Sequence, residues 1–71
     1  MTRRFEFVGG NSAKFWEVTV VGKDVTVRYG RLGTSGQAQA KSFNDDARAQ
    51  KHADTLISQK THKGYREAVT S

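Results

Sequence analysis

Residues 15–32 read FWEVTVVGKDVTVRYGRL, and this stretch decides the fold. Apolar and polar side chains alternate on both sides of Gly22-Lys23, and a period of two is typical of strands that bury one face. A two-residue loop with glycine first is typical of the type II′ turn that joins antiparallel strands. We therefore predict a β-hairpin whose strands run from Lys14 to Val21 and from Asp24 to Leu32.

The register of this hairpin predicts one apolar face and one polar face, because successive side chains in a strand point to opposite sides. Phe15 falls opposite Gly30, where an aromatic ring can cover the backbone that a strand glycine leaves bare. The apolar pairs are Val20–Val25, Val18–Val27 and Trp16–Tyr29, and the polar pairs are Thr19–Thr26 and Glu17–Arg28.

A second turn is predicted after the hairpin. Gly33-Thr34-Ser35-Gly36 has the composition of a tight turn, and it leads into a strand from Gln37 to Phe43. The small residues Ala38, Ala40 and Ser42 of that strand would share one face and leave space there. Continuing the register across the turn gives two cross-strand pairs, Lys41 opposite Arg28 and Gln39 opposite Gly30.

One more strand and a helix complete the predicted domain. Arg4 to Val8 alternates and ends in a glycine turn, whereas Asn44 with two following aspartates is typical of a helix start. An apolar stripe then predicts a helix that ends near Lys63. The stripe consists of Ala49, Ala53, Leu56, Ile57 and Lys60. The expected fold is α+β: a four-stranded antiparallel meander, one C-terminal helix on one face, and a short strand over Tyr65–Ala68 before residues 69–71 fray.

Length and charge restrict the class of protein. A chain of 71 residues makes one domain, with a core from about residue 4 to 68. Lys and Arg number 12 against 7 Asp and Glu, a formal charge of +5 that favours an anionic partner. No acidic residue lies between Asp24 and Asp45, so we expect Arg28, Arg31 and Lys41 to form one basic patch. The absence of cysteine and of any long apolar run favours a cytoplasmic protein that does not contact membranes. We also expect a monomer.

Several spaced segments resemble the WGR domain, from Phe5 to about Ala68. They are FWEVTV (15–20), GKDVTVRYGRLG (22–33), GQ (36–37), KSF (41–43) and KGY (63–65). The family's motif begins with tryptophan, whereas this chain has Tyr29-Gly30-Arg31. The resemblance implies a module found beside the catalytic region of poly(ADP-ribose) polymerases, where it contacts DNA near a strand end and touches neighbouring domains. It also implies that Tyr29 packs against nucleic acid and that Arg31 bridges DNA and an adjoining domain.

The candidate nucleic-acid-binding residues are Tyr29, Arg31, Arg28, Lys41 and Gln39. Aromatic rings stack on bases and guanidinium groups hold phosphates, which gives these residues a binding role. Spacing alone instead favours Tyr29 as an aromatic residue at the core edge against Trp16, and for Arg31 both interpretations stay open. The expected like-charge pair of Lys41 and Arg28 needs compensation, by Glu17 or by a bound phosphate.

Other residues are assigned structural roles. Gly30, Gly33 and Gly36 match no phosphate-binding glycine motif, so they are attributed to turns, and Trp16 to the core. His52 and His62 lie too far apart on the predicted helix to share a metal. Without cysteine or a paired histidine we expect no metal, no cofactor and no enzyme activity.

Two functions of different class remain open. The first is non-catalytic binding of nucleic acid, DNA rather than RNA, through phosphates and without sequence specificity. The second is docking to a neighbouring domain or an acidic protein partner. ADP-ribosyl transfer belongs to a different domain in the family that this chain resembles, and is not expected here.

Overall fold

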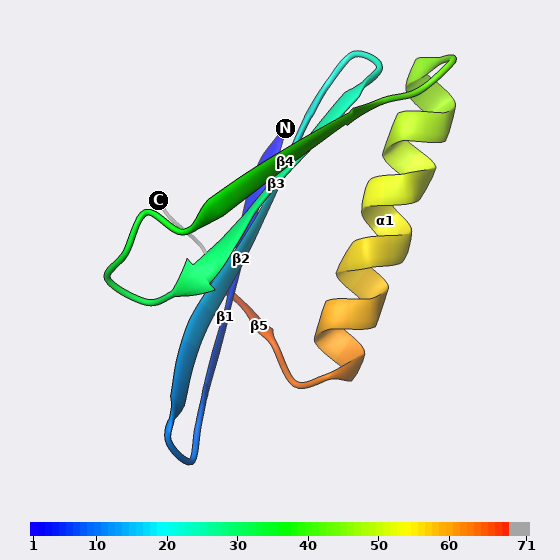
Figure 1. Ribbon diagram of the computed structural model, residues 1–71. Helices are drawn as coiled ribbons and strands as arrows, with labels where there is room; N and C mark the ends of the chain where they lie inside the picture. Colours follow the sequence, from blue (N-terminus) through cyan, green and yellow to red (C-terminus); the bar gives the residue numbers. More distant parts are fainter. Residues whose placement is uncertain (69–71) are drawn as a thin grey trace.

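The computed structural model describes residues 1–68 and shows an α+β domain, with one helix beside one face of an antiparallel sheet (Figure 1). The elements are β1 (Thr2–Gly9), β2 (Ser12–Val21), β3 (Asp24–Arg31), β4 (Gln37–Ser42), α1 (Asp46–His62) and β5 (Arg66–Ala68). The sheet order is β4-β3-β2-β1-β5, so the predicted four-stranded meander and its short C-terminal strand are confirmed. The expected fraying of residues 69–71 lies outside the described residues.

The hairpin of β2 and β3 has the predicted register in every pair. Trp16 lies opposite Tyr29, and Phe15 lies opposite Gly30. Gly22 has a φ of 59°, whereas no non-glycine residue within 1–68 has a positive φ. A positive φ at the first turn residue alone is what a type II′ turn requires, and this turn therefore fixes the register of the β2–β3 hairpin.

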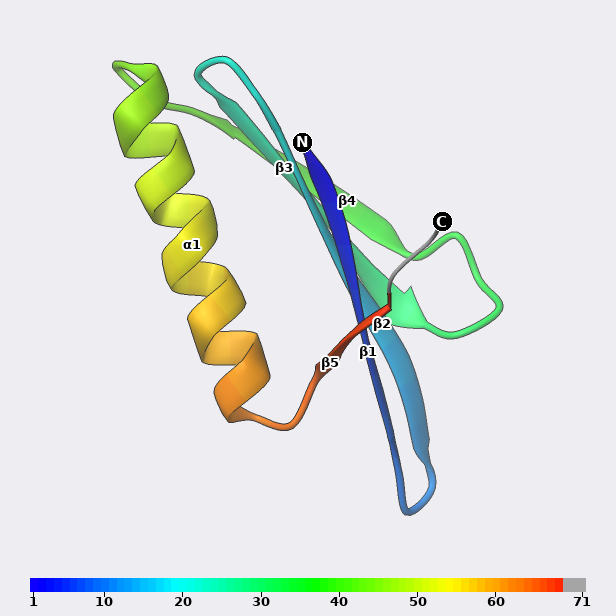
Figure 2. The same cartoon turned by 180° about the vertical axis from the view of Figure 1, so that it is seen from behind.

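The core lies between α1 and the face of the sheet that carries the hairpin valines (Figure 2). Its buried members are Phe5, Trp16, Val18, Val25, Ala49, Ala53 and Ile57. The Phe5 and Trp16 rings pack with their centroids 5.8 Å apart. The predicted helix stripe is confirmed, because its two alanines and Ile57 are buried and Leu56 and Lys60 lie half-buried at the edge of the core. The small alanine side chains let the helix backbone approach the sheet.

The helix begins one residue later than the sequence suggested. Asp45, not Asn44, is the N-cap, and its carboxylate accepts a hydrogen bond from the Arg48 backbone N–H at 2.7 Å. The C-cap is Lys63, which confirms the predicted end. Within the described residues no helix is long and apolar enough to cross a membrane.

The predicted pairing of β3 with β4 is wrong. Arg28 lies opposite Ala38 rather than Lys41, and Gln39 lies opposite Val27 rather than Gly30. Seven residues, 30–36, separate the two members of the last β3–β4 pair, Tyr29 and Gln37, in place of a tight turn, and the first two of the seven still pair with β2. The Arg31 carbonyl accepts both the N–H and the hydroxyl of Thr34, at 3.1 and 2.7 Å, and folds the loop back on itself.

This change of register moves side chains between the two faces of the sheet. The pairing is displaced by three residues, and an odd displacement turns every side chain of a strand to the other face. Gln39 and Lys41 therefore lie on the helix face with Val25 and Val27. The small residues of β4 do share one face, as predicted, and it is the outer face of the sheet.

Phe15 is buried on the outer face although no helix covers it. Its side chain is only 2% exposed. The ring lies across from Gly30, as expected, with the Arg4 guanidinium 4.5 Å from its centroid. Gly36 closes over the ring, since a Cβ there would lie 2.8 Å from Phe15 Cζ and 2.3 Å from the Tyr29 carbonyl oxygen. The loop after β3 therefore seals a small second core.

Candidate nucleic-acid interface

A cleft of about 920 Å³ lies on the helix face, between α1 and strands β2, β3 and β4. Its ionisable lining residues are Lys14, Arg31, Lys41, Lys60 and His52, and its aromatic lining residues include Trp16, Tyr29 and Tyr65. No carboxylate side chain among residues 1–68 lines it. The cleft therefore presents one sign of charge between aromatic walls.

Two of these cations oppose each other across neighbouring strands. Lys14 of β2 pairs in register with Arg31 of β3, and both side chains belong to the helix face. Like charges directly opposite each other destabilise a sheet. Within residues 1–68, the only basic side chains in ion pairs are those of Arg3, Arg4 and Arg48. The cleft cations consequently have no carboxylate partner in this part of the chain, and an anion in the cleft would relieve their repulsion.

Lys60 brings a further positive charge from the helix. Its ammonium lies 5.8 Å from the centroid of the Trp16 ring and 5.4 Å from that of Tyr65. The Lys14 ammonium lies 5.9 Å from the same Tyr65 ring. Burial lowers the pKa of Lys60, and the nearby charges of Lys63 and Lys14 lower this pKa further. The two ammonium groups thus share one aromatic surface and repel each other there.

Tyr29 lies at the boundary between core and cleft. Its ring is half-buried and packs against the core cluster, as its spacing from Trp16 predicted, and it also lines the cleft. Its hydroxyl accepts a hydrogen bond from Gln39 Nε2 at 3.4 Å and donates one to Gln37 Oε1 at 3.5 Å. The structure therefore brings Tyr29, Arg31, Gln39 and Lys41 together on one face.

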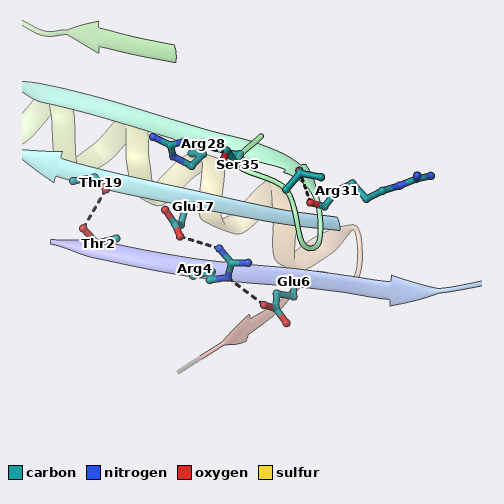
Figure 3. Close-up of polar contacts among 9 residues, drawn as sticks. Thr2, Arg4, Glu6, Glu17, Thr19, Arg28, Arg31 and Ser35 are labelled. Carbon is teal, nitrogen blue, oxygen red and sulfur yellow. Dashed lines mark hydrogen bonds and ion pairs between the residues drawn. The ribbon is translucent and has the colours of Figure 1, made fainter. Parts of the chain in front are cut away.

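Arg28 is separate from these residues, so the expected single patch with Arg31 and Lys41 is wrong. Arg28 is exposed on the outer face and donates from Nη1 to the Ser35 carbonyl oxygen at 3.0 Å. Figure 3 shows Arg31 extending past the end of its strand, away from Arg28. Strand alternation is the cause, because Arg28 and Arg31 stand an odd number of positions apart.

Glu17 does not neutralise Arg28 either. Glu17 accepts a hydrogen bond from Arg4 Nη1 at 3.0 Å, and Glu6 accepts one from Arg4 Nε at 3.1 Å (Figure 3). These bonds raise the pKa of Arg4, the contribution of Glu17 being the larger. The positive charge of Arg4 on the outer face of β1 and β2 is therefore neutralised by neighbouring carboxylates, in contrast to the charges in the cleft.

The turn role predicted for Gly33 and Gly36 agrees with their φ values of 89° and 71°, whereas Gly30 lies within strand β3 and has no positive φ. His52 packs against Phe43, with ring centroids 4.8 Å apart. Within residues 1–68 no three histidine or acidic side chains are grouped so as to hold a metal ion.

The predicted binding residues did not include Lys14, Lys60 and Tyr65, which also line the cleft. The sequence pattern did point to two of these residues. Lys14 stands opposite Arg31 once the hairpin register is extended, and Lys60 lies on the apolar stripe of the helix.

The comparison with known families gives a match to the WGR domain over residues 1–71, the whole chain. The chain belongs to the WGR domain family. A crystal structure of a Bacteroides fragilis protein contains a domain with a TM-score of 0.94 and 49% sequence identity to this chain, covering 97% of it. Two Escherichia coli K12 proteins are also similar, the uncharacterized protein YfeS at 37% identity over 67 residues and protein YehF at 42% over 65.

In these relatives the WGR domain is a small part of a larger protein. The matched region covers 94% of this chain but 28% of YfeS, and 92% of this chain but 24% of YehF. It covers 20% of the Bacteroides fragilis chain. This WGR domain thus spans between 20 and 28% of the length of each of these relatives.

Proposed function

We propose that this WGR domain is a non-catalytic module that binds nucleic acid in the cleft, contacting DNA phosphates near strand ends without sequence specificity. The observation that carries the proposal is a set of four cations, Lys14, Arg31, Lys41 and Lys60, that face one cleft lined by no carboxylate side chain of the described residues 1–68. A polyanion compensates such a set, and most of its binding free energy then comes from release of counterions.

The predicted site residues divide into roles in this proposal. Arg31 and Lys41 contact phosphates, Tyr29 offers the exposed part of its ring to a sugar or base, and Gln39 holds the Tyr29 hydroxyl in place. Arg28, on the other face, has no contact with the ligand. Phosphate contacts position a protein on nucleic acid but read no sequence, which is why we expect no sequence preference.

A second candidate function is docking to another protein domain. It is favoured by the relatives, in which the matched region is 20–28% of a longer chain and therefore lies beside other protein segments. The cleft cations would then receive an acidic surface of the neighbour.

A titration separates the two functions. Fluorescently labelled blunt, nicked and single-stranded DNA, and RNA, are each titrated with the protein at 50 and 200 mM salt. If the four cleft cations contact phosphates, the logarithm of the binding constant falls against the logarithm of salt concentration with a slope of about −3. An absence of binding to every oligonucleotide at 50 mM salt contradicts the proposal and favours docking.

A further inference from the structure

We infer that the ligand of the cleft is a single, unpaired strand of nucleic acid, and that Lys14 and Lys60 hold its phosphates at the end of the cleft where β2 begins. This inference rests on the proposed function and names its substrate class as single-stranded nucleic acid in preference to a duplex.

The shape of the cleft is the first argument. Its volume of about 920 Å³ lies near the upper end of the range of small-molecule sites, roughly 300 to 1,000 Å³, so it has room for one or two nucleotides. It is bounded by the helix on one side and the sheet on the other. A duplex keeps its bases stacked inside and presents phosphates on a convex surface, so it can touch the rim but cannot enter.

The walls of the cleft are the second argument. Tyr29 and Tyr65 are both half-buried and line it, and the Gln39 and Gln59 amides lie among them. Aromatic rings beside a basic groove are the recurring means by which proteins hold unpaired bases without reading sequence. In a duplex the faces of the bases are already stacked on one another and are not available to Tyr65 or Tyr29.

The position of the cations is the third argument. Lys41 pairs with Val25 near one end of β3, and Lys14 pairs with Arg31 at the other end. Six residues of strand separate these pairs, about 20 Å at the usual rise per residue. Lys60 stands over the second pair, against the Trp16 and Tyr65 rings. The cations therefore lie at the two ends of an aromatic floor, where they can contact phosphates on either side of an unpaired segment that runs along β3.

The outer face of the sheet does not offer a duplex an equivalent surface. It is uncovered, but Arg4 is bound by two carboxylates there, and Arg28 is hydrogen-bonded to the Ser35 carbonyl oxygen. Lys14, Arg31, Lys41 and Lys60, by contrast, line the cleft and have no carboxylate partner among residues 1–68.

The test measures fluorescence anisotropy of labelled oligothymidylate, oligouridylate and a blunt DNA duplex of equal length, at 50 and 150 mM salt. We expect the single strands to bind at least tenfold more tightly than the duplex. We expect Lys14→Gln and Lys60→Gln each to weaken single-strand binding about tenfold. Lys51→Gln is the matched control, because it removes the same charge from the exposed helix surface outside the cleft.

The outcomes are distinguishable. A duplex that binds as tightly as the single strands overturns this inference and leaves the proposed function standing. Binding of neither kind of oligonucleotide overturns both. Single-strand binding that Lys51→Gln weakens as much as Lys14→Gln and Lys60→Gln overturns the assignment to the cleft. Circular dichroism of each variant confirms that Lys60→Gln, the half-buried position, still folds.

Discussion

Replacing Gly36 with alanine is expected to lower the free energy of unfolding by about 3 kcal/mol, from a left-handed backbone and a steric clash that each cost roughly 1–3 kcal/mol. Gly36 has a φ of 71°, and an added Cβ would meet the Tyr29 carbonyl oxygen at 2.3 Å and Phe15 Cζ at 2.8 Å. Backbone atoms cannot move aside as a flexible side chain can. Urea denaturation followed by tryptophan fluorescence measures the change.

Gly33→Ala is the matched control for this prediction. Gly33 also has a positive φ, of 89°, but a Cβ there would meet no atom within 4 Å. Its substitution is therefore expected to cost only the backbone part, about 1 kcal/mol. Equal losses of stability in the two variants would show that the closure of the loop over Phe15 is not what makes Gly36 necessary.

The second large effect is expected from Lys14→Glu, which should weaken nucleic-acid binding by about 2 kcal/mol, roughly 30-fold, while stabilising the free protein. Lys14 stands opposite Arg31, so the substitution replaces a repulsive cross-strand pair with an attractive one, worth about 0.5 kcal/mol. At the same time it places a negative charge in the cleft. Opposite changes in the two properties are typical of a site held in an unfavourable state for function.

Anisotropy titration and urea denaturation of the same variant measure both changes. Lys51→Glu makes the same charge change on the exposed surface of α1, and it is expected to weaken binding only slightly. If Lys14→Glu left affinity unchanged, the like-charge pair would have no role in binding. If it destabilised the free protein, the pair would not be unfavourable in the unbound state.

The hairpin could be predicted from sequence because its signals are local. The alternation of valines and the Gly22-Lys23 turn depend only on residues close in sequence, and together they predicted the two strands, their register and the burial of Trp16. The apolar stripe gave the helix for the same reason. The cap at Asp45 was placed one residue early because Asn44 is an equally good capping residue, and only the backbone path selects between them.

The turn after β3 could not be predicted, since its length depends on contacts between distant residues. Four small polar residues suggested a tight turn, whereas the Thr34 bonds to Arg31 and the packing of Gly36 on Phe15 make it longer. The error in register also affected the predicted site, because it placed the side chains of Gln39 and Lys41 on the wrong face of the sheet. Lys60 could not be assigned to the cleft before the position of the helix over the sheet was known.

The most direct test of binding in the cleft is a ¹⁵N–¹H NMR titration of the protein with oligothymidylate. We expect the largest shifts at the amides of Lys14, Arg31, Lys41 and Lys60 and at the Trp16 indole, all of which line the cleft. The amides of Thr26, Arg28 and Ala38, whose side chains belong to the outer face, should shift little. Shifts concentrated on Thr26, Arg28 and Ala38, with Lys14 and Lys60 unaffected, would contradict the cleft as the binding site.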